Sequence, residues 1–174
     1  MNEKRKPLLA VKNLSVSFQE ERGFKKRRIQ PIRDLSLEIC AGEITALAGA
    51  SGSGKSLLAQ AVMGILPEQA AAEGTIEFQG QELTKEYLRA LRGREIALIP
   101  QGVNGLDPLM RAGNQIRKGR KDLASFKRME ELLDRYGLPG ETADKYPFEL
   151  SGGMARRVLT AGAMMEGPRL VIAD

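Results

Sequence analysis

One run of eight residues, Gly49–Ser56, limits the possible folds more than any other part of the sequence. The run is Gly-Ala-Ser-Gly-Ser-Gly-Lys-Ser, which fits the pattern Gly-x-x-x-x-Gly-Lys-Ser. The apolar run Ile44–Ala48 precedes it, and an apolar pattern with helical spacing follows from about Gly54. A buried strand, a glycine-rich turn and a helix in this order predict a phosphate-binding loop in an α/β fold.

The residue types of this Walker A motif suit the phosphates of a nucleoside triphosphate, ATP foremost. Glycines let successive N–H groups turn toward phosphate oxygens, and the helix N-terminus adds partial positive charge. We expect Lys55 to reach the outer phosphates and Ser56 to offer its hydroxyl to Mg²⁺. The predicted nucleotide site comprises Gly49, Ala50, Ser51, Gly52, Ser53, Gly54, Lys55, Ser56 and Leu57.

The remaining hydrophobic pattern predicts strands on both sides of the loop and helices after it. Alternation predicts strands at Leu8–Phe18 and Ile32–Ile39, with a polar turn or an exposed hairpin tip over residues 20–30 between them. From residue 102 to residue 150 the pattern changes to helices and loops. Further strands are expected at 74–78, 96–99 and 170–173, and helices from 54, over 87–91, from Asp122 to Tyr136 and after Gly153.

Composition narrows the function classes. The chain has 174 residues, 42% hydrophobic and 28% charged, as expected of one soluble globular domain. The net charge of +5 falls in short basic clusters such as Arg117–Lys121, which we interpret as solvated loops. Aromatic residues make up only 5%, so no nucleic-acid partner is expected. The sequence has no histidine, which excludes a histidine-based triad or metal site, and no apolar stretch of transmembrane length.

A second candidate metal ligand ends the apolar run Leu170–Ala173. Asp174 follows that run directly. In open α/β sheets a carboxylate at the C-terminal end of a buried strand lies beside the phosphate loop. We therefore interpret Asp174 as a Walker B aspartate that holds Mg²⁺ directly or through water.

The segment Leu150-Ser151-Gly152-Gly153-Met154 resembles the signature motif of ATP-binding cassette (ABC) ATPases. Taken alone, Ser-Gly-Gly predicts only a helix-capping turn. The Walker A motif, Pro100-Gln101 after a strand and this segment together match the family in order and spacing along all 174 residues. The stretch Tyr146–Met154 looks most similar to the ATPases of dipeptide, oligopeptide and nickel importers.

The resemblance implies roles for the matching residues only. Gln101 and Lys55 would be the catalytic residues, and Gln101 would also contact Mg²⁺ together with Ser56 and Asp174. Ser151, Gly152 and Gly153 would contact the γ-phosphate held by a second nucleotide-binding domain in a head-to-tail dimer. Phe18 lies near the place of the aromatic that stacks on adenine, although it equally suits the core face of Leu14 and Val16.

The implied fold is α/β: a P-loop NTPase (ABC ATPase) core with an N-terminal antiparallel β subdomain and a helical insert, its C-terminal part missing. We expect a β subdomain and Walker A core at 7–100, a Gln101 loop and helical subdomain at 101–153, and a signature helix and Walker B strand at 154–174. The implied function is ATP-driven uptake of a peptide or nickel-type solute. The chain would bind the cytoplasmic face of the membrane through permease subunits.

Two catalytic groups of the family have no counterpart here. A glutamate follows the Walker B aspartate in the family, and a later loop supplies a histidine; the sequence has neither. We therefore expect weak nucleotide binding and negligible hydrolysis, and interpret the chain as part of a longer gene product. Its Ile44–Ala48 and Leu170–Ala173 strands would then lack a shared neighbour. A non-catalytic nucleotide-binding module and another P-loop NTPase are the alternatives, although no guanine-specifying Asn-Lys-x-Asp occurs.

Overall fold

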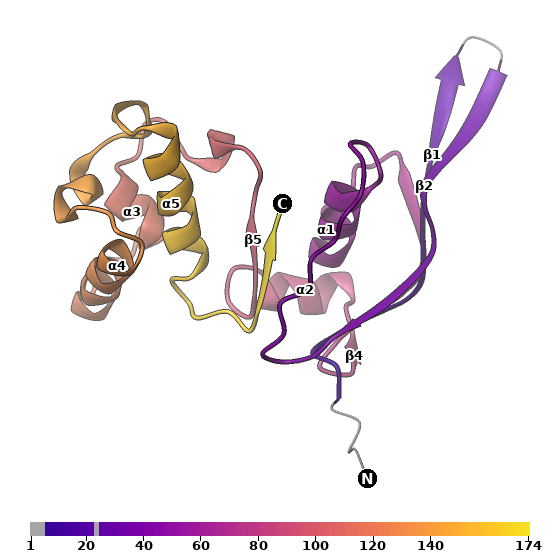
Figure 1. The fold of residues 1–174 in the computed structure, drawn as a ribbon, viewed down its shortest axis with the longest axis horizontal. Coiled ribbons are helices and arrows are strands. Elements are labelled where there is room, and N and C mark those ends of the chain that lie inside the picture. The colour runs from indigo at the N-terminus through magenta and orange to yellow at the C-terminus, as the bar shows by residue number, and fades with distance from the viewer. Residues whose placement is uncertain (1–5, 23–24) are drawn as a thin grey trace. The chain divides into compact units, whose positions relative to one another are not determined.

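A four-stranded antiparallel sheet carries the first of the two compact units into which the chain divides, residues 1–91 and residues 92–174. The computed structural model describes the backbone of residues 6–22 and 25–174. The order in the sheet is β2-β1-β3-β4, with a long hairpin of β1 and β2 (Figure 1). The strands are β1 at Leu9–Arg22, β2 at Lys25–Ile39, β3 at Ala70–Phe78 and β4 at Gln81–Glu82.

The hairpin is longer than its hydrophobic alternation predicts. Pairing between β1 and β2 continues to Arg22 and Lys25, so the hairpin alternative for residues 20–30 agrees with the fold and a turn over the whole segment does not. Residues 23 and 24 lie outside the described part. The hydrogen bonds of a strand pair join backbone groups, so a stretch of polar residues can also form strands. The register shifts at three places between Val11 and Phe18, where bulges interrupt the pairing.

Helix α1, Lys55–Met63, begins directly after the glycine-rich run, as predicted. Leu58 and Val62 are buried on its inner face. The helix ends at Gly64, whose φ of 59° is left-handed, before Pro67. Ile65 therefore lies beyond the helix and is 45% exposed. A second short helix, α2 at Lys85–Leu91, closes this unit.

The strand predicted at Ile44–Ala48 is absent. These residues have no regular secondary structure, and every residue from 41 to 50 is exposed. Ile44 is completely exposed and Leu47 is 51% exposed. Neither sheet of the described residues includes this segment as a neighbouring strand. An apolar run becomes a buried strand only when adjacent strands satisfy its backbone groups, and no strand in the described part of the chain pairs with this one.

The second unit combines a parallel strand pair with helices. The strands predicted at 96–99 and 170–173 are present, and β5, Ile96–Ile99, pairs in parallel with β6, Leu170–Ala173. Ile96 is fully buried, whereas Val171 is 38% exposed, so β6 is not buried on both faces. The helices are α3 at Ala112–Ile116, α4 at Leu123–Arg135 and α5 at Gly152–Ala163, with 3₁₀ turns at Val103–Gly105, Gly140–Asp144 and Pro147–Glu149.

The core of this unit lies among α3, α4 and α5. Its most deeply buried members are Ala112, Ile116, Leu132, Val158 and Ala161. The Asp122 carboxylate accepts from the Ser125 N–H at 2.8 Å and caps α4, as its sequence predicts. Leu123, at the start of α4, is 85% exposed, whereas Leu132 and Leu133 in its second half are buried.

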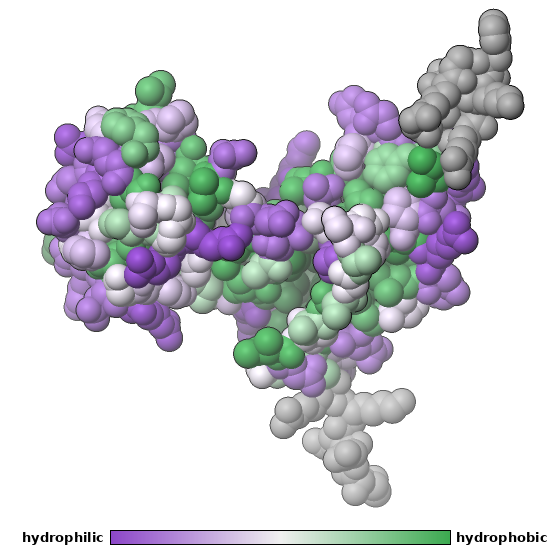
Figure 2. All heavy atoms as spheres, turned by 45° about the horizontal axis from the view of Figure 1, so that its top comes forward, coloured by the Kyte–Doolittle hydropathy of each residue, from purple (hydrophilic) through white to green (hydrophobic). Residues whose placement is uncertain are grey.

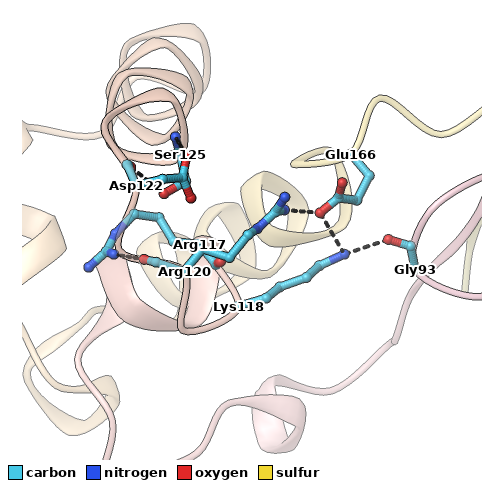
Figure 3. Close-up of polar contacts among 7 residues, drawn as sticks. All are labelled: Gly93, Arg117, Lys118, Arg120, Asp122, Ser125 and Glu166. Atoms are coloured by element: carbon cyan, nitrogen blue, oxygen red, sulfur yellow. Dashed lines mark hydrogen bonds and ion pairs between the residues drawn. The ribbon is translucent and has the colours of Figure 1, made fainter.

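The basic turn between α3 and α4 is not simply a solvated loop (Figure 3). Arg117 is buried, and its guanidinium lies 3.8 Å from the centroid of the Phe126 ring. Arg120 makes an ion pair with Glu166, which follows α5, and Lys118 lies 3.9 Å from the same carboxylate. Lys118 also donates to the Gly93 carbonyl at 2.5 Å. Burial, and next the nearby Arg120 and Arg94, lower the pKa of Lys118.

Apolar side chains reach the surface of both units. The most exposed large ones are Ile44, Leu109, Leu123 and Phe148. Figure 2 shows hydrophobic residues interspersed with hydrophilic ones on the face drawn. Among the described residues, no helix is both long and apolar enough to cross a membrane.

Candidate functional site

The turn Gly49–Ser56 obtains its shape from glycines in the left-handed region. Gly52 has a φ of 80° and Gly54 a φ of 92°, and Gly54 is the residue before α1. Other residue types are strained at such angles. A Cβ on Gly54 would also lie 3.1 Å from the Ile32 side chain, so this glycine permits the close approach of α1 to the sheet. The backbone angles therefore favour glycine at Gly52 and Gly54, and close packing against Ile32 favours it further at Gly54.

Lys55 lies folded over this turn. Its ammonium group donates to the carbonyl oxygens of Gly49 at 2.7 Å and Ala50 at 2.8 Å, and it lies 3.3 Å from the Ser53 hydroxyl. A Cβ on Gly49 would come within 2.7 Å of the same hydroxyl. The turn thus has no room for a side chain at Gly49 and holds a positive charge at its centre, beside the N-terminus of a helix.

The neighbouring residues of the turn are open to solvent. Ser51, Gly52, Ser53 and Ser56 are exposed, and Leu57 is half-buried in the first turn of α1. The residue before α1 is Gly54, so no side chain caps this helix N-terminus, whose N–H groups point along the helix axis toward the turn. A phosphate group satisfies donors of this kind, and the residues present therefore fit a bound polyphosphate.

The second glycine-containing turn, at Ser151–Gly153, begins helix α5. The Ser151 hydroxyl accepts from the Met154 N–H at 3.3 Å and caps the helix. A Cβ on Gly152 or Gly153 would meet no atom within 4 Å. Packing inside this unit therefore does not require glycine there, and the exposed backbone is open to a close approach from outside.

Gln101 and Asp174 follow the two parallel strands at the same edge. Gln101 comes two residues after the end of β5, and Asp174 comes directly after β6. The Asp174 N–H donates to the Ile99 carbonyl at 3.0 Å and extends the pairing to this point. The guanidinium of Arg156, in α5, donates to the Gln101 carbonyl. Gln101 and Asp174 are both exposed.

The donor types fit a magnesium ion. Ser56 offers a hydroxyl, Gln101 an amide oxygen and Asp174 a carboxylate, and Mg²⁺ prefers hard oxygen ligands of these kinds. The three residues belong to different units, Ser56 to the first and the other two to the second. Among the described residues no group of three His, Cys, Asp or Glu side chains forms a metal cluster.

Phe18 lies in the middle of the antiparallel sheet, half-buried, opposite Ile29 of β2 and Ala70 of β3. Its neighbour Ser17 is buried, and a cavity of about 530 Å³ is lined by Ser17, Gln19, Arg28, Glu68, Gln69, Ala70, Ala71 and Glu73. The two roles considered for Phe18, adenine stacking and core packing, both remain predictions, because half-burial is compatible with either.

Arg156 is the residue of this region that sequence reasoning missed. Arg156 and Arg157 follow the turn Ser151–Gly153, called here the signature turn. Their place in a helix indicates by itself only that the two charges are exposed. Only the placement of α5 beside the loop after β5 brings the Arg156 guanidinium to Gln101. No local pattern could have predicted this contact, because 55 residues separate the two positions.

Comparison with known families places the chain among nucleotide-binding proteins of transporters. The family model described as ABC transporter matches residues 32–174. The oligopeptide transport ATP-binding protein OppD of Bacillus subtilis is 37% identical over 96% of this chain and 49% of its own length. The dipeptide transport ATP-binding protein DppD of the same organism is 34% identical, over 96% and 53% respectively. The chain thus spans about half the length of the curated relatives it matches.

Solved structures give the same fold. The ATP-binding cassette MJ0796, in a dimeric post-hydrolysis state bound to ADP and Pi, superposes with a TM-score of 0.78 at 27% identity. The match covers 95% of this chain and 73% of that one. The cbiO1 protein of Clostridium perfringens superposes with a TM-score of 0.73 at 24% identity, over 97% and 65%, and supports the fold alone. The predicted α/β fold with a P-loop NTPase core is confirmed.

Proposed function

This chain belongs to the ABC transporter family, and we propose that it acts as the ATP-binding subunit of a peptide importer. One observation carries the proposal: the left-handed glycine turn that holds the Lys55 ammonium group at the N-terminus of α1. This is a geometry suited to the β- and γ-phosphates of a nucleotide. The oligopeptide and dipeptide relatives favour peptides as the solute class over nickel.

The proposed roles follow the chemistry of each residue. The backbone of Gly49–Ser56 binds phosphate oxygens, and Lys55 adds a point charge. Ser56, Gln101 and Asp174 would hold Mg²⁺, which when bound offsets the negative charge of the phosphates. Gln101 orients the attacking water. Phe18 is a candidate for adenine stacking, and core packing is its alternative role.

The proposed partners are a second ATP-binding cassette and the membrane subunits of an importer. The open glycines at Ser151–Gly153 support contact with a γ-phosphate held by that second cassette. The dimeric state named for the similar cassette MJ0796 is compatible with this arrangement. We place the chain at the cytoplasmic face of the membrane, held there by the membrane subunits. Because a composite site needs groups from two cassettes, we expect little turnover from a monomer. Slow hydrolysis by these 174 residues stays a prediction.

Calorimetric titration of the chain with Mg·ATP tests the nucleotide part of the proposal. We expect saturable binding that falls at least about tenfold in Lys55→Ala, since a charge-assisted contact to phosphate is lost. Lys145→Ala, which removes a half-buried lysine paired with Glu141 in the other unit, serves as the matched control. Equal binding by wild type and Lys55→Ala, or tighter binding of GTP than of ATP, would contradict the proposal.

Phosphate release tests the expected slow turnover. The wild-type chain and Lys55→Ala are expected to release phosphate from ATP at the same low rate. A clearly higher steady-state rate for the wild type would refute the hydrolysis deficiency while leaving the ATP-binding proposal intact.

A further inference from the structure

Two consecutive arginines of α5 contact different parts of the second unit. The Arg156 guanidinium donates to the Gln101 carbonyl, in the loop after β5. Arg157 instead donates to the carbonyls of Gly137 at 2.8 Å and Tyr136 at 3.3 Å, at the end of α4. Arg157 therefore attaches α5 to the helical core, whereas Arg156 attaches it to the Gln101 loop.

Apolar packing independently places the same loop on this face of α5. A Cβ on Gly105 would lie 3.6 Å from the Leu159 side chain and 3.5 Å from the Pro100 ring. Leu159 follows Arg156 by three residues, so the two side chains share a helix face. The segment from Pro100 to Gly105 thus contacts α5 at two places, through an ionic hydrogen-bond donor and through an apolar side chain.

We propose that Arg156 is a positioning residue that fixes the Gln101 backbone relative to the signature turn. Arg156 lies in the first turns of α5, three residues after Gly153. A displacement of α5 at the Ser151 end is then transmitted to Gln101 through this hydrogen bond, while Leu159 contacts the loop at a second place. The inference rests on the proposed function, in which Ser151 contacts the nucleotide of a second cassette and Gln101 the Mg²⁺ of its own.

A nitroxide label on the loop tests the positioning directly. The label is attached at Val103→Cys in a Cys40→Ser background, which removes the single native cysteine. In Arg156→Ala we expect the mobile fraction of the label spectrum to rise about two- to fivefold, because the variant loses an exposed charged contact that holds the loop. Arg156→Lys, which keeps a charged donor, is expected to recover part of the immobile fraction.

Arg157→Ala is the matched control, since it removes the same charge from the neighbouring residue. It is expected to lower the melting temperature and to leave the label spectrum unchanged. An immobile label in Arg156→Ala, or an equal increase of mobility in Arg157→Ala, would overturn the proposal. If Arg156→Ala does not fold, Arg156→Met, which keeps the length of the side chain without its donors, replaces it.

Turnover by the full-length protein assembled with its membrane subunits tests the consequence for chemistry. Arg156→Ala is expected to lower kcat about two- to fivefold and to leave KM for ATP unchanged, because the contact it removes is exposed and lies outside the phosphate loop. A mobile label with unchanged kcat would overturn the link between Arg156 and turnover. A wild-type assembly without ATP turnover would contradict the proposed function, whereas the label result would still decide the position of the loop.

Discussion

Two glycine-containing turns precede helices in this chain, and their structures have different causes. The turn Gly49–Ser56 depends on left-handed glycines and on Lys55, which donates to the carbonyls it surrounds. The turn Ser151–Gly153 has no glycine with positive φ and instead has a serine cap on a helix packed into a core. A glycine-containing turn before a helix can thus be shaped by its own backbone or held in place by its helix.

Core truncation behind α5 is expected to have the largest effect. Leu132 is fully buried against the helical core, so Leu132→Ala should lower the free energy of unfolding by about 3 kcal/mol. Amide exchange in residues 154–158 should increase in parallel, because the signature turn depends on that core. Urea unfolding and hydrogen exchange measure both effects. Leu123→Ala in the same helix, at an 85% exposed position, should change stability by less than about 0.5 kcal/mol.

Substitution in the phosphate-loop turn tests the opposite dependence, on backbone angle. Gly54→Ala places a Cβ at a φ of 92° and 3.1 Å from Ile32, and should cost about 2 kcal/mol of stability. Gly52→Ala has a similar φ of 80° but open space around the Cβ, so it should cost only about 1 kcal/mol. Thermal unfolding of both variants separates the contact with Ile32 from the backbone strain. Equal losses would mean that this contact contributes nothing.

The cap of α5 contributes less. Ser151→Ala removes the acceptor for the Met154 N–H and should lower the free energy of unfolding by about 0.5–1 kcal/mol. Ser151→Asn keeps an acceptor of the same kind and should retain most of the stability while altering any contact with phosphate. Chemical denaturation distinguishes the two variants. A loss as large in Ser151→Asn as in Ser151→Ala would argue against the capping role.

The smallest change in stability is expected at Gly152. Nothing lies within 4 Å of a Cβ there, and alanine is the better helix former, so Gly152→Ala should be neutral or stabilising by up to about 1 kcal/mol. The same variant should weaken ATP-dependent dimerisation, measured by analytical ultracentrifugation, because the added methyl group obstructs the approach of phosphate. Destabilisation comparable with that of Gly54→Ala would remove the distinction between the two turns.

Features governed by neighbouring residues could be predicted from the sequence. The start of α1 after the glycine run, the Asp122 cap of α4 and the Ser151 cap of α5 each depend on residues within a few positions. The apolar runs that form β5 and β6 were also identified correctly. Family membership followed from motif order, and the comparisons confirm it.

Features governed by distant residues could not be predicted from the sequence. Ile44–Ala48 has the composition of a buried strand, but a strand also needs neighbours, and the sheets of the described residues provide none. Arg117 belongs to a run of basic residues. It is nevertheless buried, with its guanidinium packed against the Phe126 ring. The assigned roles of Phe18, Gln101 and Asp174 in ligand binding remain predictions.

The sequence alone determined that this chain has a turn suited to phosphate, because glycine angles, a lysine and a helix N-terminus are local properties of consecutive residues. Only the tertiary structure decided which apolar run pairs into a sheet and which arginine reaches Gln101. Both outcomes depend on surfaces brought together from positions far apart in the chain, where hydrogen bonds and buried contacts must be satisfied simultaneously.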